Sequence, residues 1–262
     1  MAKYNKIGKT YNQTRKGDPR IFQELFNLLN QPTNKTILDV GAGTGNYANL
    51  LANKGNKIVA LEPSIKMINQ SQDNDRIEWL RGVAENIEIE NNFFDSAICI
   101  LSTHHFKDWK KSFKEINRVL KPNGTLIIYT YLPENQEYFW LEHYFPKLFK
   151  VDIAKFPNVE TLQERMKTCK FKIASINKYE LPHDLKDNFL AASWRNPRNY
   201  LKNEIRGGIS TFSLLTKDEI EQGVNKLSND LKNGNWHNQF GDILTQTYFD
   251  AGYRFLKIIK ES

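Results

Sequence analysis

Short apolar segments alternate with longer amphipathic segments along residues 35–131 of this 262-residue chain. The apolar segments are rich in Ile, Leu and Val and are typical of buried strands; they cover 36–40, 57–61, about 76–80, 95–101 and 124–130. The segments between them carry apolar residues at helical spacing, at about 44–54, 64–71 and 109–120. Strands separated by helices predict a parallel sheet with helices on both faces.

The regions on either side of this alternation are less regular. Residues 1–17 show no clear period and are interpreted as an arm, and Asp18-Pro19 then gives a helix an N-cap acceptor and a first-turn proline. Further along, strands are expected at 171–180 and 253–259, with a helical segment between them. We predict an N-terminal arm or lid at 1–17, an α/β core at 18–182, a helical cap inserted at 183–248, and a final edge strand of the core within 249–262.

Composition narrows the class of protein. A hydrophobic fraction of 40% and a charged fraction of 26% are ordinary for a globular chain that buries a full core. No apolar run approaches the ~20 residues that span a bilayer, and residues 1–6 lack the apolar core of a signal peptide. We therefore expect a cytoplasmic protein that does not engage a membrane.

The net charge and the two cysteines indicate neither a nucleic-acid partner nor a metal site. The net charge is +7, but the basic residues are scattered among acids, so we expect a solvated basic surface rather than a nucleic-acid partner. The arm alone is locally basic. Cys99 and Cys169 lack the spacing of a metal site and are interpreted as buried thiols, and no metal is expected.

The most specific motif is the run 36–46, in which an apolar strand leads into Gly41, Gly43 and Gly45 and a helix then begins. Glycine tolerates positive φ and has no Cβ, so the backbone can turn tightly and approach a ligand. The turn also delivers that ligand to the positive end of a helix. The next strand ends at Glu62, about 20 residues after Gly41, where a carboxylate can meet the hydroxyls of a ribose lying on the turn. The pattern predicts a nucleoside-binding α/β protein.

The glycine spacing distinguishes between classes of nucleoside. A dinucleotide-binding fingerprint places its third glycine three positions after the second, but here that position is Asn46 and Gly45 comes early. With Asp39 just before the turn, the run resembles the first motif of class I S-adenosylmethionine-dependent methyltransferases. A nicotinamide-dependent dehydrogenase remains an alternative, which a preference for NAD in calorimetry would support.

Three further segments resemble the same family, in order. Leu61-Glu-Pro-Ser64 with Met67 looks like the second motif, 81–86 like the adenine-edge loop, and 94–106 with the helix after it like the fourth strand of the small-molecule branch (methyltransferase-11/25-like). The resemblance covers about residues 1–131. It implies a Rossmann-like, seven-stranded, mostly parallel sheet with helices on both faces, here with a helical C-terminal cap. It also implies S-adenosylmethionine as cofactor and S-adenosylhomocysteine as product.

The resemblance also implies a role for individual residues. Gly41, Ala42 and Gly43 would lie under the methionine moiety, Asp39 would steady the turn and the amino end of the ligand, and Glu62 would accept hydrogen bonds from both ribose hydroxyls. The other implied cofactor residues lie beside the adenine, beside the sulfonium centre or in the arm, which folds over the cofactor in some relatives: Pro63, Met67, Ala84, Glu85, Leu101, His104, Tyr11 and Arg15.

The sequence departs from the family at Val83. Many relatives carry an aspartate there, which accepts a hydrogen bond from the adenine amino group, and valine cannot accept one. That hydrogen bond is therefore missing or supplied by a neighbour such as Glu85.

Candidate catalytic residues follow the fourth strand. His104 and His105 lie at the carboxyl edge of the predicted sheet, where open sheets bind ligands. Either could act as a general base if the acceptor atom must lose a proton. A shaping or hydrogen-bonding role and a purely structural role stay open.

The acceptor is expected to be a small molecule. The fourth strand is followed neither by the Asn/Asp-Pro-Pro-Tyr signature of amino-group methylation on adenine or glutamine nor by the Pro-Cys of cytosine C5 chemistry. In the cap, Trp194, Arg195 and Trp236 are candidates for binding a planar or carboxylated substrate, although the tryptophans could equally form the core of the cap. Methylation of RNA or protein, and a non-catalytic cofactor-binding protein, remain alternatives. A monomer or homodimer is expected.

Overall fold

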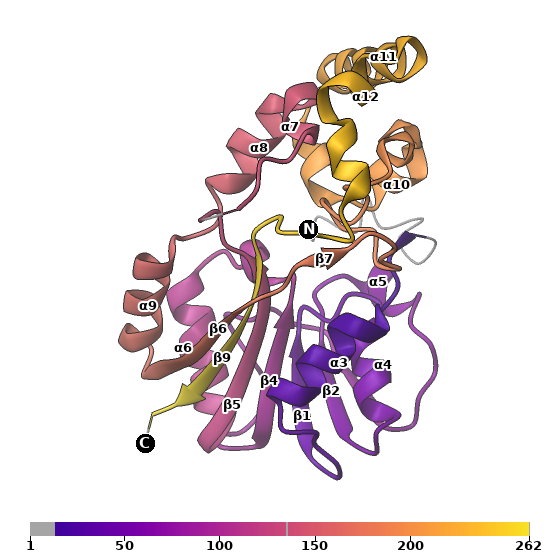
Figure 1. Cartoon of the computed structure of the whole chain (residues 1–262). Coiled ribbons are helices and arrows are strands. Elements are labelled where there is room, and N and C mark those ends of the chain that lie inside the picture. Colours follow the sequence, from indigo (N-terminus) through magenta and orange to yellow (C-terminus); the bar gives the residue numbers. More distant parts are fainter. Residues whose placement is uncertain (1–13, 135, 262) are drawn as a thin grey trace.

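The computed structural model describes residues 14–134 and 136–261. Within them, one sheet of seven strands runs in the order β3-β2-β1-β4-β5-β9-β6 (Figure 1). Its strands are β1 (Thr36–Val40), β2 (Lys57–Leu61), β3 (Ile77–Leu80), β4 (Phe94–Ile100), β5 (Leu120–Tyr131), β6 (Phe171–Lys178) and β9 (Tyr253–Lys260). The predicted Rossmann-like fold class is confirmed.

The first five strands are parallel, and β9 is antiparallel to both β5 and β6. Chain order reverses at β1, which pairs with β2 on one side and with β4 on the other. Ligands of open α/β sheets bind outside the carboxyl ends of the strands at such a point. The prediction that the last strand is the edge strand is wrong, because β9 lies between β5 and β6 and the edge is β6.

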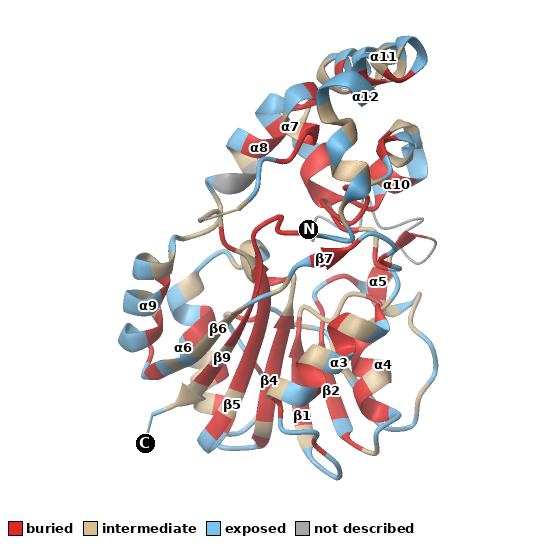
Figure 2. Ribbon diagram, viewed as in Figure 1, coloured by how far each residue is buried: buried red, intermediate tan, exposed pale blue. Residues whose placement is uncertain are grey.

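Successive residues of β1 point to opposite faces of the sheet, as the pleat requires. Ile37 belongs to a core shared with α3 and α4, and Leu38 to a second core shared with α6 and α9. Figure 2 shows the strands buried between these layers. The helices of the α/β layers are α3 (Pro19–Leu28), α4 (Asn46–Ala52), α5 (Ile65–Ile68), α6 (Trp109–Val119) and α9 (Val159–Thr168).

Polar side chains fix where these helices begin. The Asp18 carboxylate accepts a hydrogen bond from the Arg20 backbone N–H at 2.9 Å, as predicted for an N-cap, and Asp108 does the same for Lys111 at 3.0 Å. Helix α6 ends at Val119 and β5 is assigned from Leu120. Residues 121–124 have no partner on β4 and Asn123 has φ of +59°, so the chain turns there before the pairing resumes at Thr125.

The remaining elements form a cap over the carboxyl ends of the strands (Figure 1). Its helices and short strands are α7 (Leu141–Tyr144), α8 (Pro146–Ile153), α10 (Asn203–Gly207), α11 (Lys217–Asn233), α12 (Asn235–Phe240), β7 (Leu181–Pro182) and β8 (Tyr248–Phe249). Four 3-10 helices accompany the regular elements within the described residues: η2 (Thr103–His105), η3 (Pro197–Leu201), η4 (Ser210–Leu214) and η5 (Gly241–Thr245).

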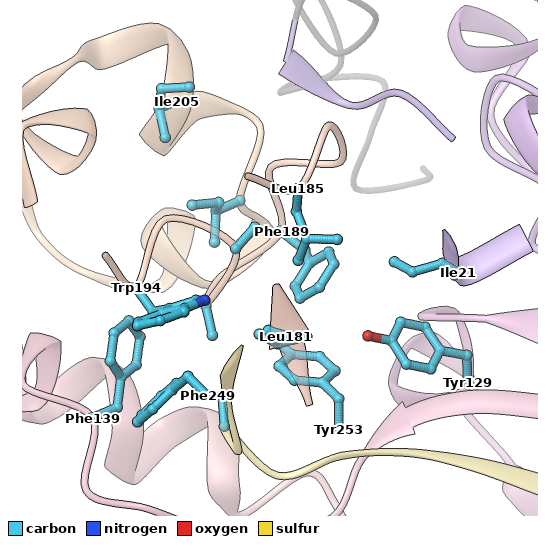
Figure 3. Packing of buried hydrophobic residues seen from close by; sticks show 14 of the residues in the cluster. Ile21, Tyr129, Phe139, Leu181, Leu185, Phe189, Trp194, Ile205, Phe249 and Tyr253 are labelled. Carbon is cyan, nitrogen blue, oxygen red and sulfur yellow. The ribbon is translucent and has the colours of Figure 1, made fainter. Parts of the chain in front are cut away.

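The cap is larger than the predicted 183–248 insertion. Trp140, beside α7, packs on Trp236 of α12 with ring centroids 5.3 Å apart, and its indole N–H donates to the Trp194 carbonyl at 2.7 Å. The segment 139–153, predicted to belong to the core, therefore packs with the cap. Trp194 in turn stacks on Phe249 (Figure 3).

Two further findings concern the described part of the chain. No helix there combines the length and apolar character needed to cross a membrane. No cluster of three or more His, Cys, Asp or Glu side chains there is arranged to hold a metal ion. Cys99 and Cys169 are both buried and unbridged.

Candidate functional site

The glycine turn after β1 requires glycine for two reasons. Gly41, Gly43 and Gly45 have φ of +75°, +61° and +78°, in the left-handed region that L side chains rarely adopt. In addition, a Cβ on Gly41 would lie 2.6 Å from the Cβ of Ser102. The Ser102 hydroxyl donates to the Val40 carbonyl at 2.6 Å, which holds the end of β4 against the turn.

Glu62 joins this turn to the end of β2. One carboxylate oxygen accepts from the Gly43 N–H at 3.0 Å and the other from the Ser64 N–H at 2.9 Å. The residue is 5% exposed, and burial raises the pKa of its carboxyl group while the two N–H donors oppose that rise. Each oxygen keeps a further lone pair for a ligand hydroxyl.

Asp39 places a second carboxyl group under the same turn. It is 3% exposed, and burial, followed by the charge of Glu62, raises its pKa to about 7. None of the hydrogen bonds among the described residues ends on this carboxylate. An ionised carboxylate in such a place is stabilised by a cationic partner, so the site suits a ligand with an ammonium group.

Asp39→Asn should therefore raise stability in a pH-dependent way. A carboxyl group whose pKa is higher in the folded than in the unfolded protein contributes stability at low pH, and that contribution is lost as the pH rises towards 7. We expect the free energy of unfolding of Asp39→Asn to exceed that of the parent by about 1–2 kcal/mol at pH 8 and to match it near pH 4. Urea unfolding without ligand measures both; a difference that does not change with pH would contradict the assignment.

The turn and both carboxylates line a cavity of about 680 Å³ between the sheet and the cap. Every predicted cofactor residue that the structure describes lines this cavity: Arg15, Asp39, Gly41, Ala42, Gly43, Glu62, Pro63, Met67, Ala84, Glu85, Leu101 and His104. Tyr11 lies outside the described residues. A pocket of this size is ample for a nucleoside-bearing ligand.

The residues that the family resemblance places beside the adenine line the cavity together. Met67 and Ala84 are 1% and 5% exposed, and the Val83 side chain beside them is 42% exposed. One oxygen of Glu85 accepts from the Lys107 and Asp108 N–H groups at 2.6 and 3.2 Å, which ties the loop after η2 to this part of the cavity. The structure thus places Glu85 close to the position where Val83 departs from the family.

The middle of the cavity is formed by the chain after β4. Leu101 has φ of +51°, a strained conformation for a branched side chain and one that clusters at functional sites. His104 and His105 follow in η2 with ring centroids 3.9 Å apart, and both line the cavity. The structure brings both predicted histidines to the cavity.

Arg15 connects the end of the arm to the cap. Its guanidinium pairs with the Asp187 carboxylate, and the Tyr47 hydroxyl donates to the same carboxylate at 3.5 Å. The Asn188 N–H and side-chain amide both donate to the Thr14 carbonyl, at 3.1 and 2.9 Å. Asp187 was not predicted, because a single aspartate in a segment without periodicity carries no signal in the sequence.

The predicted substrate-binding residues are not at the site. Trp194 and Trp236 are fully buried in the core of the cap, and neither they nor Arg195 line the cavity. That prediction is wrong, because the tryptophans pack on Trp140 and Phe249 instead. The sequence reasoning missed the aromatic lining of the cavity, which comes from the ends of β5 and β9 and from the cap: Tyr131, Phe139, Phe149, Phe156, Phe189 and Tyr253.

Known proteins that resemble this chain identify its family. The profile of the methyltransferase domain family matches residues 38–128, the stretch that supplies the turn, both carboxylates and the histidines. A crystal structure from Anabaena variabilis ATCC 29413, described as a methyltransferase from an antibiotic biosynthesis pathway, is 39% identical with a TM-score of 0.88. The match covers 94% of this chain and 98% of that one. The chain belongs to the class I S-adenosylmethionine-dependent methyltransferases.

Curated relatives of this methyltransferase are more distant. Sterol 24-C-methyltransferase of Saccharomyces cerevisiae is 26% identical over 62% of the chain and 44% of its own length. Demethylmenaquinone methyltransferase of Thermotoga maritima is 29% identical over 47% of the chain and 55% of its own length. The chain spans about half the length of these curated relatives.

Proposed function

We propose that this methyltransferase transfers a methyl group from S-adenosylmethionine to a small-molecule acceptor. The observation that supports it most is that the glycine turn, the two carboxylates and the histidines line one cavity together with side chains of the cap. Because the cap covers the cavity, the acceptor must fit entirely inside it, and this favours a small molecule. The small-molecule relatives support the same class of acceptor.

The residues on the sheet side orient the donor. Glu62 accepts from the ribose hydroxyls, Met67 and Ala84 flank the adenine, and Asp39 faces the ammonium group of the methionine moiety. Leu101 and His104 border the sulfonium centre, which supplies an activated methyl group. Since methyl transfer is an in-line displacement with a good leaving group, the protein acts mainly by alignment and by excluding water.

His104 or His105 completes the site for an acceptor that must lose a proton. An unperturbed imidazole titrates near neutrality and can accept that proton at physiological pH. Both rings lie on the side of the cavity where β4 ends, between the glycine turn and the cap. The proposal also includes a cytoplasmic location, which the two buried free thiols favour.

A transfer assay tests the proposal against its alternatives. The protein is incubated with methyl-labelled S-adenosylmethionine and a cell extract, and the products are separated by ultrafiltration. We expect label in the low-molecular-weight fraction as a compound other than the cofactor, and none with Gly43→Val. Label in RNA or protein, weakening steeply with salt for RNA, would instead support a macromolecular acceptor. Cofactor binding without transfer would indicate a non-catalytic protein.

A further inference from the structure

We propose that the methyl acceptor is a flat, largely apolar aromatic compound with a ring hydroxyl group, and that the hydroxyl oxygen is methylated. The proposal rests on the proposed function and names the acceptor class for the same cavity. Apart from His104, it is carried by side chains that the methyl-donor half of the site does not use. The chain contributes them from β5, the segment after α8, the segment after β7, and β9.

A continuous row of aromatic rings runs from the histidines into the cap. His104 lies 5.2 Å from Phe156, and Phe156 lies 5.2 Å from Tyr131, measured between ring centroids. Tyr131 lies 5.8 Å from Tyr253, and Tyr253 lies 4.7 Å from Phe189. We call these five residues the aromatic wall; all of them line the cavity.

The aromatic wall continues into the packed core of the molecule. Figure 3 shows Phe189 and Tyr253 beside one another, with Tyr129 and Leu181 close by. Tyr253 and Phe189 are 5% and 4% exposed, so the far end of the wall is held firmly in place. Rigid rings at these spacings offer faces and edges against which a further aromatic ring can pack.

The rest of the acceptor space is also mainly apolar. The cap adds hydrophobic side chains to the cavity: Phe139, Phe149, Leu190, Ala191, Ile209 and Leu214. Phe139 and Phe149 are 5% and 6% exposed and lie 5.8 Å apart as an edge-to-face pair. An acceptor here loses most of its contact with water, which favours an apolar body over a charged one.

Basic side chains beside the aromatic wall favour an acceptor group that gives up a proton. Among the carboxylates at the cap side, Asp187 pairs with Arg15, and Glu137 accepts from the Asp250 N–H at 3.2 Å. Asp39 and Glu62 lie at the glycine turn with the donor. His104, His105 and Lys155 also line the cavity beside the wall, and these three side chains are basic. Basic groups favour an acceptor that becomes anionic, such as an aryl hydroxyl group.

The donor, the acceptor and the histidines account for the bond formed, the bond broken and the proton released in the transfer. A lone pair of the hydroxyl oxygen forms the new bond to the methyl carbon, and the carbon–sulfur bond breaks with its electron pair staying on sulfur. The products are an aryl methyl ether and S-adenosylhomocysteine. The hydroxyl proton passes to the imidazole of His104 or His105, next to the end of the aromatic wall, and from there to solvent.

Matched pairs of alcohols test the acceptor class. Phenol, 2-naphthol and 2-hydroxyanthracene are each compared with the ring-saturated alcohol of the same skeleton, by calorimetry on protein loaded with S-adenosylhomocysteine. We expect at least one aromatic member to bind about tenfold more tightly than its saturated partner and to yield its methyl ether with S-adenosylmethionine. Phe156→Leu should reduce that preference about 3- to 10-fold. Phe93→Leu is the matched control, because Phe93 is 36% exposed and lies outside the cavity. This variant should leave the preference for the aromatic alcohol unchanged.

The outcomes separate this proposal from the one on which it rests. If S-adenosylhomocysteine does not bind, both proposals fail. If it binds but no aromatic alcohol exceeds its saturated partner, or if 2-naphthylamine is methylated in place of 2-naphthol, the aryl hydroxyl proposal is overturned and the methyltransferase proposal stands. A preference that Phe156→Leu leaves intact would contradict the role of the aromatic wall.

Discussion

Gly43→Val is expected to abolish binding of S-adenosylhomocysteine, with a loss of affinity of at least 100-fold. Gly43 has φ of +61°, its N–H donates to Glu62, and it lines the cavity. A branched side chain strains this conformation by about 1–3 kcal/mol and also fills space that the methionine moiety needs. Calorimetric titration of the purified variant measures the loss.

Gly55→Val provides the matched control for strain. Gly55 has φ of +89°, and a Cβ there would meet only Asn34, at 3.9 Å, outside the cavity. Both variants should unfold at a somewhat lower temperature than the parent, whereas only Gly43→Val should lose the ligand. Gly43→Ala, with a smaller side chain, should bind more weakly than the parent even if the valine variant does not fold. Parental affinity in Gly43→Ala would contradict a ligand lying on this turn.

Glu62→Ala is expected to weaken binding of the same ligand by about 1–3 kcal/mol, or roughly 5- to 150-fold. The change removes an acceptor for the ribose hydroxyls, which would then be buried without partners. It also leaves the N–H groups of Gly43 and Ser64 without the carboxylate that holds the turn to β2. Calorimetric titration of the variant and the parent at the same pH gives the difference directly.

Glu78→Ala is the control for loss of a carboxylate near this part of the sheet. Glu78 lies on β3, is exposed, and does not line the cavity. Its removal should leave the affinity within twofold of the parent. Equal affinities for Glu62→Ala and the parent would show that Glu62 is not the ribose acceptor.

The parallel half of the fold could be predicted because its signals are local. Each strand of residues 36–100 is a short apolar run, and each run is followed by a turn or a helix start that the residue types encode. The position of β9 between β5 and β6 could not be predicted, since it depends on pairing between segments far apart in the chain.

The grouping of the predicted cofactor residues around one cavity was predictable for the same reason, and the aromatic lining of that cavity was not. Gly41, Asp39 and Glu62 occupy fixed places on consecutive elements, so spacing alone brings them together. Phe156 and Phe189 come from irregular segments, and nothing in their sequence context distinguishes a cavity ring from a core ring. Trp194 and Trp236 show the converse, since prominent aromatic residues proved to be packing for the cap.

A crystal structure of the complex with S-adenosylhomocysteine is the most direct test of the central claim. The account predicts that the sugar hydroxyls lie on Glu62, the adenine between Met67 and Ala84, and the sulfur near Leu101 and His104, facing the aromatic wall. A ligand bound elsewhere, or one whose sulfur faces away from the aromatic wall, would contradict it.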